Sequence, residues 1–395
     1  MNIEIPQIRL AGVERLALIA LAVVGAITAG VGIGLAPDRL WASVLLVSYY
    51  IVGVGLAGLC FVAIHYTTGA SWSVAIRRVA EALAGMLLLG LVLIAIVFIV
   101  RPQLYPWMNT ALNTLGSPDD PALAFKRFWL SRPFFLARAA TYAVIWSVFA
   151  FAIRRCSRKQ DLDGDRRWTR ANARLSASFL VVFAVTFTMA SVDWVMSLEP
   201  MWYSTIFGIY NWAGLFQSGL AALILAALWL EWRGPLRNVL NEEHLHDLGK
   251  LLFAFSIFWV YIWFSQYMLI WYTNIPEETT YFVRRLHGYW FWLFLANVIF
   301  NWLVPFVMLM RRDAKRDRKT MGRVAAVVLL GRWVDLYLMI FPGVVGEAPR
   351  IGPWEIGLTA GGIGCFGLLF VWILRRAPAV PIADPQLSES LQYEQ

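Results

Sequence analysis

The chain has 395 residues, of which 59% are hydrophobic, only 15% are charged and 20 are tryptophan. This composition excludes an ordinary soluble domain and is typical of a protein that crosses a membrane several times. The formal net charge of +9 at pH 7 fits nucleic-acid binding as well as basic cytoplasmic loops, so the positions of the charges must decide between them.

Ten apolar segments along the chain are each long enough to cross a roughly 30 Å hydrocarbon core as a helix. They are 15–36, 40–64, 79–100, 133–153, 175–198, 205–231, 248–272, 288–310, 323–341 and 354–374. We therefore predict an all-α polytopic membrane domain over residues 1–376. The remaining residues, 377–395, predict an extended cytoplasmic tail that becomes ordered on a partner.

Lysine and arginine are concentrated in alternate connections between these segments. Counted with Lys250 and Arg323 at the adjoining segment ends, the connections on the side of the two termini hold 23 of them, and the connections on the other side hold 8. By the positive-inside rule, both termini face the cytoplasm, so we expect the chain in a cytoplasmic membrane. The basic residues therefore report topology, and we predict that the chain does not bind nucleic acid.

The two strongest basic runs begin at Arg154 and Arg311, after the fourth and eighth segments. If segments two to five (40–198) and six to nine (205–341) are two four-helix bundles, each run occupies the third connection of its bundle. This arrangement predicts a parallel tandem repeat, with the first and tenth helices at the periphery.

Ligands for redox cofactors are missing from the positions where such cofactors need them. The three cysteines are far apart and form no CxxC pair, and no two of the four histidines oppose each other inside the hydrocarbon region. The cysteines are Cys60, Cys156 and Cys365, and the histidines are His65, His244, His246 and His287. We predict that this chain binds no haem, iron–sulfur cluster or other metal. Whether it binds a quinone is left open.

Ionisable residues at membrane depth are the main candidates for function, because a charge at the centre of a helix costs about 2.5–3.5 kcal/mol to insert. Arg332 and Asp335 lie three residues apart in the ninth segment. Two interpretations are equally favoured, a mutually neutralised structural ion pair and a role in proton conduction.

A second group lies toward the expected outer side. Arg138 is near the outer end of the fourth segment, Asp193 is in the last turns of the fifth, and Glu199 follows it. Thr186 shares a helix face with Asp193. We expect Arg138 to pair with Asp193, although both carboxylates could instead be hydrated at the interface.

Charged residues flank the seventh segment at both ends. His246, Asp247 and Lys250 lie at its inner end, where Asp247 could act as a helix cap with solvated neighbours. Glu277 and Glu278 follow its outer end and are most simply an exposed loop. Both groups are also candidates for collecting or releasing protons.

Hydroxyl groups inside the seventh segment fall on one side of the predicted helix. Tyr261, Ser265 and Tyr272 lie within about 40° of one another at 3.6 residues per turn. Hydroxyls gain nothing from facing lipid, so we expect this stripe to face other helices or water and to support proton movement.

Several stretches carry a family resemblance. HDLGKLLFAF from His246, FSQYMLIWY from Phe264, NIPEET from Asn274, SVDWVMSLEP from Ser191 and MWYSTIFGIY from Met201 resemble the ActF family. This is the second large NrfD/PsrC-like membrane subunit of bacterial alternative complex III. The resemblance covers most of residues 175–312 and weakens toward both termini.

The resemblance implies a cofactor-free subunit of a quinol-oxidising complex that is not catalytic alone. Menaquinol would be oxidised in a sister NrfD-like subunit beside an iron–sulfur protein, and electrons would pass to partners that carry c-type haem. This chain would be a scaffold and a candidate proton path. The alternatives are an NrfD-like subunit with its own quinone site and a secondary transporter. For a transporter, Pro305 and the glycines of the second segment do not occupy matching positions.

The charge distribution generates a test of topology. Single cysteines introduced near Lys159 and Lys315 should resist a membrane-impermeant thiol reagent added from the periplasmic side. A cysteine near Glu277 should react with it and serves as the control. Reaction of the first two from outside would reverse the orientation.

Overall fold

The computed structural model describes residues 8, 10–109, 121–346 and 348–394, and within these ranges the regular structure is entirely helical. Ten spans are long and apolar enough to cross a membrane. They coincide with the ten predicted segments, and several extend beyond them by a turn or more. The prediction of an all-α, multi-pass membrane protein is therefore confirmed.

The ten spans are built from the longer helices, and four of them combine two or three consecutive elements. They are α1 (Gly12–Leu35), α2 (Pro37–Thr68), η1 with α3 and α4 (Trp72–Ile76, Arg77–Ala84 and Leu87–Val100), α7 (Arg132–Asp163), α8 with η4 (Arg166–Trp194 and Met196–Leu198), α9 (Phe207–Arg233), α10 (Glu242–Thr273), α12 with η5 and α13 (Trp290–Val298, Ile299–Leu303 and Val304–Met308), α15 with most of α16 (Arg318–Ile340 and Pro342–Val345) and α17 (Pro353–Leu374).

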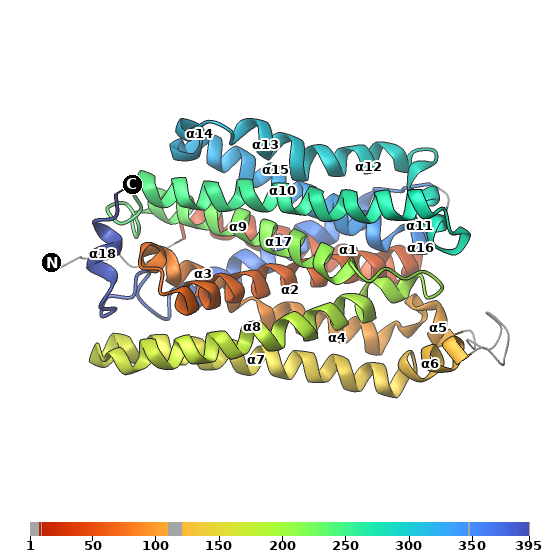
Figure 1. Ribbon diagram of the computed structural model, residues 1–395, viewed down its shortest axis with the longest axis horizontal. Helices are drawn as coiled ribbons and strands as arrows, with labels where there is room; N and C mark the ends of the chain where they lie inside the picture. The colour runs from red at the N-terminus through yellow and green to blue at the C-terminus, as the bar shows by residue number, and fades with distance from the viewer. Residues whose placement is uncertain (1–7, 9, 110–120, 347, 395) are drawn as a thin grey trace.

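Short helices cap the two ends of this bundle. At one end, the terminus face, lie α14 (Arg312–Arg316), α18 (Leu387–Leu391) and the start of α1 (Figure 1). At the other end, the opposite face, lie α5 (Pro106–Asn109), α6 (Pro121–Trp129), α11 (Pro276–Leu286) and α16 (Pro342–Val345) (Figure 1). Which of the two faces is cytoplasmic stays a prediction.

Three helices that start at the terminus face begin with a side-chain cap. Asp165 accepts from the backbone N of Arg167 at 2.8 Å, and Asn241 accepts from the N of His244 at 2.9 Å. Asp317 likewise accepts from the N of Thr320 at 2.9 Å. The suggested cap at Asp247 is wrong, because α10 already starts at Glu242 and Asn241 caps it.

The central helices contact one another in two groups that share a pattern. In the first group α2 contacts α4 and α8, while α7 contacts α8 and α4. In the second group α9 contacts α10 and α15, while α12 contacts α15 and η5 contacts α10. Helices α2 and α9 therefore hold equivalent places, and the groups meet where α2 contacts α9 and α15 and where α8 contacts α9.

The first and last spans, α1 and α17, pack against each other outside both groups, and α17 also contacts α2 and α3. Glycines allow the close approach: a Cβ placed on Gly25 would lie 2.4 Å from the Cα of Gly361, and one on Gly357 would lie 2.2 Å from Thr28 Oγ1. Small residues permit such backbone contact in lipid, where dispersion and not the hydrophobic effect holds helices together.

The C-terminal tail is not extended, so that prediction is wrong. It folds back across the terminus face, forms α18 and buries Val380 and Leu387. Ser390 Oγ donates to the carbonyl of Trp72 at 2.7 Å and accepts from the backbone N of Ala75 at 3.1 Å. These contacts are intramolecular, so the tail needs no partner to be ordered.

The glycine contact predicts different effects for two alanine substitutions in α1. Gly25→Ala should lower the free energy of unfolding by about 1–3 kcal/mol, because the new methyl group overlaps α17. Gly30→Ala should have little effect or stabilise by up to about 1 kcal/mol, because nothing lies within 4 Å of its Cβ position. Unfolding in detergent micelles measures both, and equal effects would contradict the packing argument.

Candidate functional site

The carboxylate of Asp335, in α15, is the centre of a buried polar network. Arg332 Nη1 donates to Asp335 Oδ2 at 2.5 Å, and Asn297 Nδ2 of α12 donates to Oδ1 at 3.1 Å. The hydroxyl of Tyr210, in α9, donates to the same Oδ1. Arg332 and Asp335 are only 3% and 1% exposed, so three helices meet at a charge pair shielded from bulk solvent.

Small residues and a helix irregularity give this network its room. A Cβ on Gly214 would lie 2.4 Å from Arg332 Nη1, so the absence of one lets the guanidinium group lie against α9. Beside Gly331, the π-helical turn η5 presents Asn301, whose Nδ2 donates to Asn297 Oδ1 at 2.7 Å. Single π-helical turns often occur at functional sites.

The same network links the two four-helix groups. Arg332 Nη2 donates to Asn211 Oδ1 of α9 at 3.2 Å. Tyr49 of α2 donates to that oxygen at 3.3 Å, and its hydroxyl lies 3.3 Å from Ser191 Oγ of α8. We call Asp335, Arg332, Tyr210, Asn297, Asn211, Tyr49 and Ser191 the core network.

A narrow cavity borders Asp335. Its volume is about 20 Å³, measured as the space open to the centre of a water molecule, which is enough for about one water. Gln266 of α10 lines it, and its Nε2 is buried without a hydrogen-bond partner among the described residues. Asp335 and Gln266 thus offer a water molecule both an acceptor and a donor.

Helix α11 closes the cavity toward the opposite face. Tyr281 and Arg285 of this helix line it. Burial raises the pKa of Tyr281 to about 12, so its phenol stays neutral near pH 7. Arg285 Nη2 donates to Glu199 Oε1 at 2.7 Å, and Arg284 Nη1 lies 3.6 Å from Glu199 Oε2. Glu199 is therefore an ion-paired neighbour of this end of the cavity.

Asp193, near the end of α8, belongs to a separate buried cluster. Arg138 pairs with it as expected, donating from Nε at 2.9 Å and from Nη2 at 2.8 Å. Trp129 Nε1 donates at 2.8 Å and the Tyr142 hydroxyl at 3.0 Å. Thr186 accepts from Trp146 Nε1 at 2.9 Å instead of contacting Asp193. Four donors hold this carboxylate, which favours a structural role.

The stripe of Tyr261, Ser265 and Tyr272 does not face the bundle of this chain, so whether it faces the helices of another subunit or water stays a prediction. Tyr261 is 63% and Tyr272 81% exposed, and Ser265 is half-buried. The buried side of α10 presents Trp259 and Gln266 instead. The spacing of the hydroxyl groups identified one side of the helix. Because the rest of the helix is apolar all round, the spacing did not show which side faces inward.

Glu277 and Glu278 are also not in a loop. They occupy the first turn of α11, where the free backbone N–H groups and the helix dipole favour carboxylates. Glu277 is exposed and Glu278 is half-buried. The structure places neither of them in the core network or in the lining of its cavity.

The charged residues at the start of α10 form a cluster on the terminus face. Lys250 Nζ lies 2.5 Å from Asp247 Oδ1, and His246 Nδ1 lies 3.7 Å from Glu243 Oε2. Arg316 of α14 pairs with Glu243. The tail reaches this cluster through Tyr393, whose hydroxyl donates to Asp247 Oδ2 at 2.9 Å.

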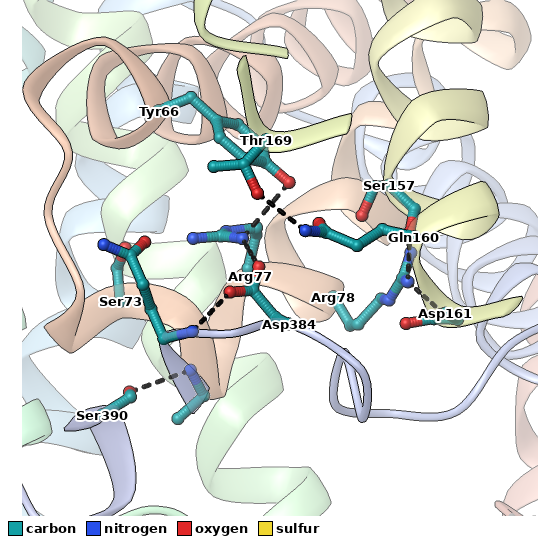
Figure 2. Close-up of polar contacts among 12 residues, drawn as sticks. Tyr66, Ser73, Arg77, Arg78, Ser157, Gln160, Asp161, Thr169, Asp384 and Ser390 are labelled. Carbon is teal, nitrogen blue, oxygen red and sulfur yellow. Dashed lines mark hydrogen bonds and ion pairs between the residues drawn. The ribbon is translucent and has the colours of Figure 1, made fainter. Parts of the chain in front are cut away.

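A second contact anchors the tail to α3. Arg77 Nη1 donates to Asp384 Oδ2 at 2.5 Å and to the Tyr66 hydroxyl at 3.2 Å, and Figure 2 shows these groups converging. Arg77 and Asp384 are 2% and 1% exposed. No short-range pattern in the sequence signals this pair, because its members come from distant parts of the chain.

Apolar residues separate the terminus face from the core network. On the buried side of α10, Leu248, Gly249 and Leu252 follow Asp247. On the buried side of α15, the residues before Gly331 are Met321, Val324, Ala325 and Val328. The core network therefore lies nearer to the opposite face, and its cavity is bordered by α11 there.

The sequence analysis missed the other five members of the core network and the cavity residue Gln266; the five are Tyr210, Asn297, Asn211, Tyr49 and Ser191. The amide side chains of Asn297 and Asn301, one helical turn apart in an otherwise apolar segment, were the available signal. Buried amides in a membrane helix need partners and therefore mark its inward side.

Within the described residues, no group of three or more His, Cys, Asp or Glu side chains could hold a metal ion. The prediction that haem and iron–sulfur clusters belong to other subunits stays a prediction. Comparison with protein-family models finds no matching family, and comparison with curated proteins finds no match. Function must therefore be argued from the residues themselves.

The geometry predicts strong coupling between Arg332 and Asp335. Asp335→Leu should destabilise by about 3–5 kcal/mol, because it leaves a buried guanidinium group unpaired, and Arg332→Met should act likewise. The double variant should lose clearly less than the two single losses together. Chemical unfolding in mixed micelles measures this cycle.

An exposed ion pair provides the control. Asp38→Leu removes the partner of Arg101, at side-chain exposures of 67% and 30%, and should cost no more than about 1 kcal/mol. If the two single losses in the free energy of unfolding add up to the loss in the double variant, Arg332 and Asp335 are not energetically coupled.

Proposed function

We propose that this chain is a cofactor-free membrane subunit of a bacterial alternative complex III, next to the sister subunit that oxidises menaquinol. In this role it supports proton movement and leaves electron transfer to the iron–sulfur and c-type haem subunits. The resemblance of the stretches from Ser191, Met201, His246, Phe264 and Asn274 to the ActF family supports this assignment.

The observation that carries the proton role is the core network with its water-sized cavity. Asp335 is a carboxylate inside the membrane core, and donors from three helices surround it. Chains of hydrogen bonds that include water can relay protons, and buried charges in membranes commonly mark such relays. The cavity is large enough for about one water molecule, to which Asp335 offers an acceptor and Gln266 a donor.

The position of the network favours exchange with the opposite face. The apolar residues of α10 and α15 named above lie between the network and the terminus face. On the other side, Tyr281 and Arg285 of α11 line the cavity, and Glu199 pairs with Arg285 toward the opposite face. If the termini are cytoplasmic, this face is the periplasmic one. The proposed role is then proton release on that side during turnover.

The exposed aromatic side of α10 is a candidate contact for the sister subunit. Tyr261, Phe264, Met268 and Trp271 are all exposed along it. The Tyr261 hydroxyl lies well inside the span, where lipid offers no hydrogen-bond partner. A neighbouring membrane subunit would supply one.

The two alternatives fit this geometry less well. A quinone ring is several times larger than the water-sized cavity beside Asp335, so a quinone site there would require α11 to move. A transporter needs a substrate space between its two bundles, yet at that boundary Arg332, Asn211 and Tyr49 contact one another directly.

The proposal is tested with the whole complex reconstituted in vesicles. Asp335→Asn keeps the shape of the side chain but cannot exchange a proton at neutral pH. Proton release per electron should fall, while quinol oxidation by the sister subunit should persist at least in part. The ratio comes from a pH-sensitive dye outside the vesicles and from reduction of the electron acceptor.

Two further variants sharpen the test. Asp193→Asn should change the ratio less than Asp335→Asn, because four donors fix Asp193 in a separate cluster. Asp38→Asn, an exposed carboxylate on the opposite face, should leave the ratio unchanged. If Asp335→Asn preserves both ratio and turnover in an assembled complex, the network is structural and the subunit is a scaffold.

A further inference from the structure

A small hollow lies on the flank of the terminus face, where α3, α7 and the end of α17 come together. Arg78 and Glu81 of α3, Arg154 and Arg158 of α7 and Leu374 of α17 are among the residues that line it. Its volume is about 20 Å³ by the measure used above. None of these residues belongs to the core network.

The hollow carries an excess of positive charge. Arg78 donates to Glu81 Oε2 at 2.7 Å. It also donates to the carbonyl of Ser157 at 3.1 Å and pairs with Asp161, as Figure 2 shows. Arg154 and Arg158 have no ion pair or hydrogen bond with any other residue that the structure describes. Three arginines therefore line the hollow with one carboxylate, that of Glu81, and the second carboxylate, that of Asp161, pairs with Arg78 beside it.

Polar atoms at the base of the hollow are unsatisfied. Arg78 Nε and Glu81 Oε1 are buried and have no hydrogen-bond partner among the described residues. The Arg78 and Glu81 side chains are 3% and 5% exposed. Buried polar atoms normally have partners, so one donor and one acceptor here await groups from outside the chain.

An apolar track leads away from the hollow along the membrane. Gly85 lies at its edge, where a Cβ would come within 2.7 Å of Ile373 Cδ1 and 3.0 Å of Arg154 Nη1. Beyond Gly85, the lipid-facing side of α4 presents Leu88, Val92, Ile96 and Ile99, all exposed. These residues form one stripe at helical spacing.

The level of the hollow matches that of lipid headgroups. Arg154 lies about 33 Å along α7 from its first residue, which is close to the roughly 30 Å thickness of the hydrocarbon core. Nearby, the Arg376 guanidinium lies 3.4 Å from the ring centroid of Trp372, an exposed tryptophan at the end of α17. Tryptophan and arginine commonly anchor helices at this level.

We propose that the hollow is a binding site for one anionic phospholipid. The phosphate lies on Arg154 and Arg158, a headgroup hydroxyl donates to Glu81 Oε1, and an acyl chain follows the stripe on α4. Basic pockets between membrane helices recognise anionic headgroups in this way. The continuous apolar track favours a lipid over an acidic protein segment, which would have no use for it.

The test measures lipid binding to the full chain in nanodiscs or mild detergent. Native mass spectrometry should show one phosphatidylglycerol retained in preference to phosphatidylcholine. Arg154→Gln and Arg158→Gln should each reduce this preference about fivefold. Arg155→Gln is the matched control on the same helix, because Arg155 lies over the exposed Phe151 ring and does not line the hollow.

The outcomes separate the lipid from other ligands. Equal retention of the two lipids by the unaltered chain would overturn the proposal, and so would an equal loss in Arg155→Gln. Inorganic phosphate that competes fully with phosphatidylglycerol at millimolar concentration would assign the hollow to free phosphate instead. The preference of the unaltered chain decides the matter even if an arginine variant fails to fold.

Discussion

The polar core of this protein depends on how one buried carboxylate is satisfied. Moving Asp335 and Arg332 into a membrane core is favourable only if their hydrogen-bonding capacity is met by protein. The structure meets it with Tyr210 and Asn211 of α9 and Asn297 of α12. Several backbone features make room for these contacts. They are Gly214 of α9, Gly331 of α15 and the π-helical turn η5.

Sequence reasoning captured the features that depend on composition and on short spacing. The ten spans follow from apolar run length, and the Arg332–Asp335 pair follows from two charges three residues apart. The Arg138–Asp193 pair also followed, because opposite charges at similar depth on consecutive helices have few other partners in lipid. In each case one local rule was sufficient.

Features that depend on distant partners escaped the same reasoning. The tail was predicted to be extended until a partner orders it, yet Asp384 within it pairs with Arg77 of the distant helix α3. Tyr261, Ser265 and Tyr272 share a helix side, but only the positions of α9 and α12 reveal that Gln266 faces the cavity. A helix that is apolar all round carries little information about which side faces inward.

The pairing of α1 with α17 also orders events during synthesis. At about 5–20 residues per second, α17 emerges roughly 15–60 s after α1. Throughout that interval the surface of α1 around Gly25 lacks the helix that covers it in the finished protein, and only the end near Gly32 can already contact α2. Closure of this outermost helix pair is therefore a late step of biogenesis, and a chain cut short before α17 leaves α1 without its main packing partner.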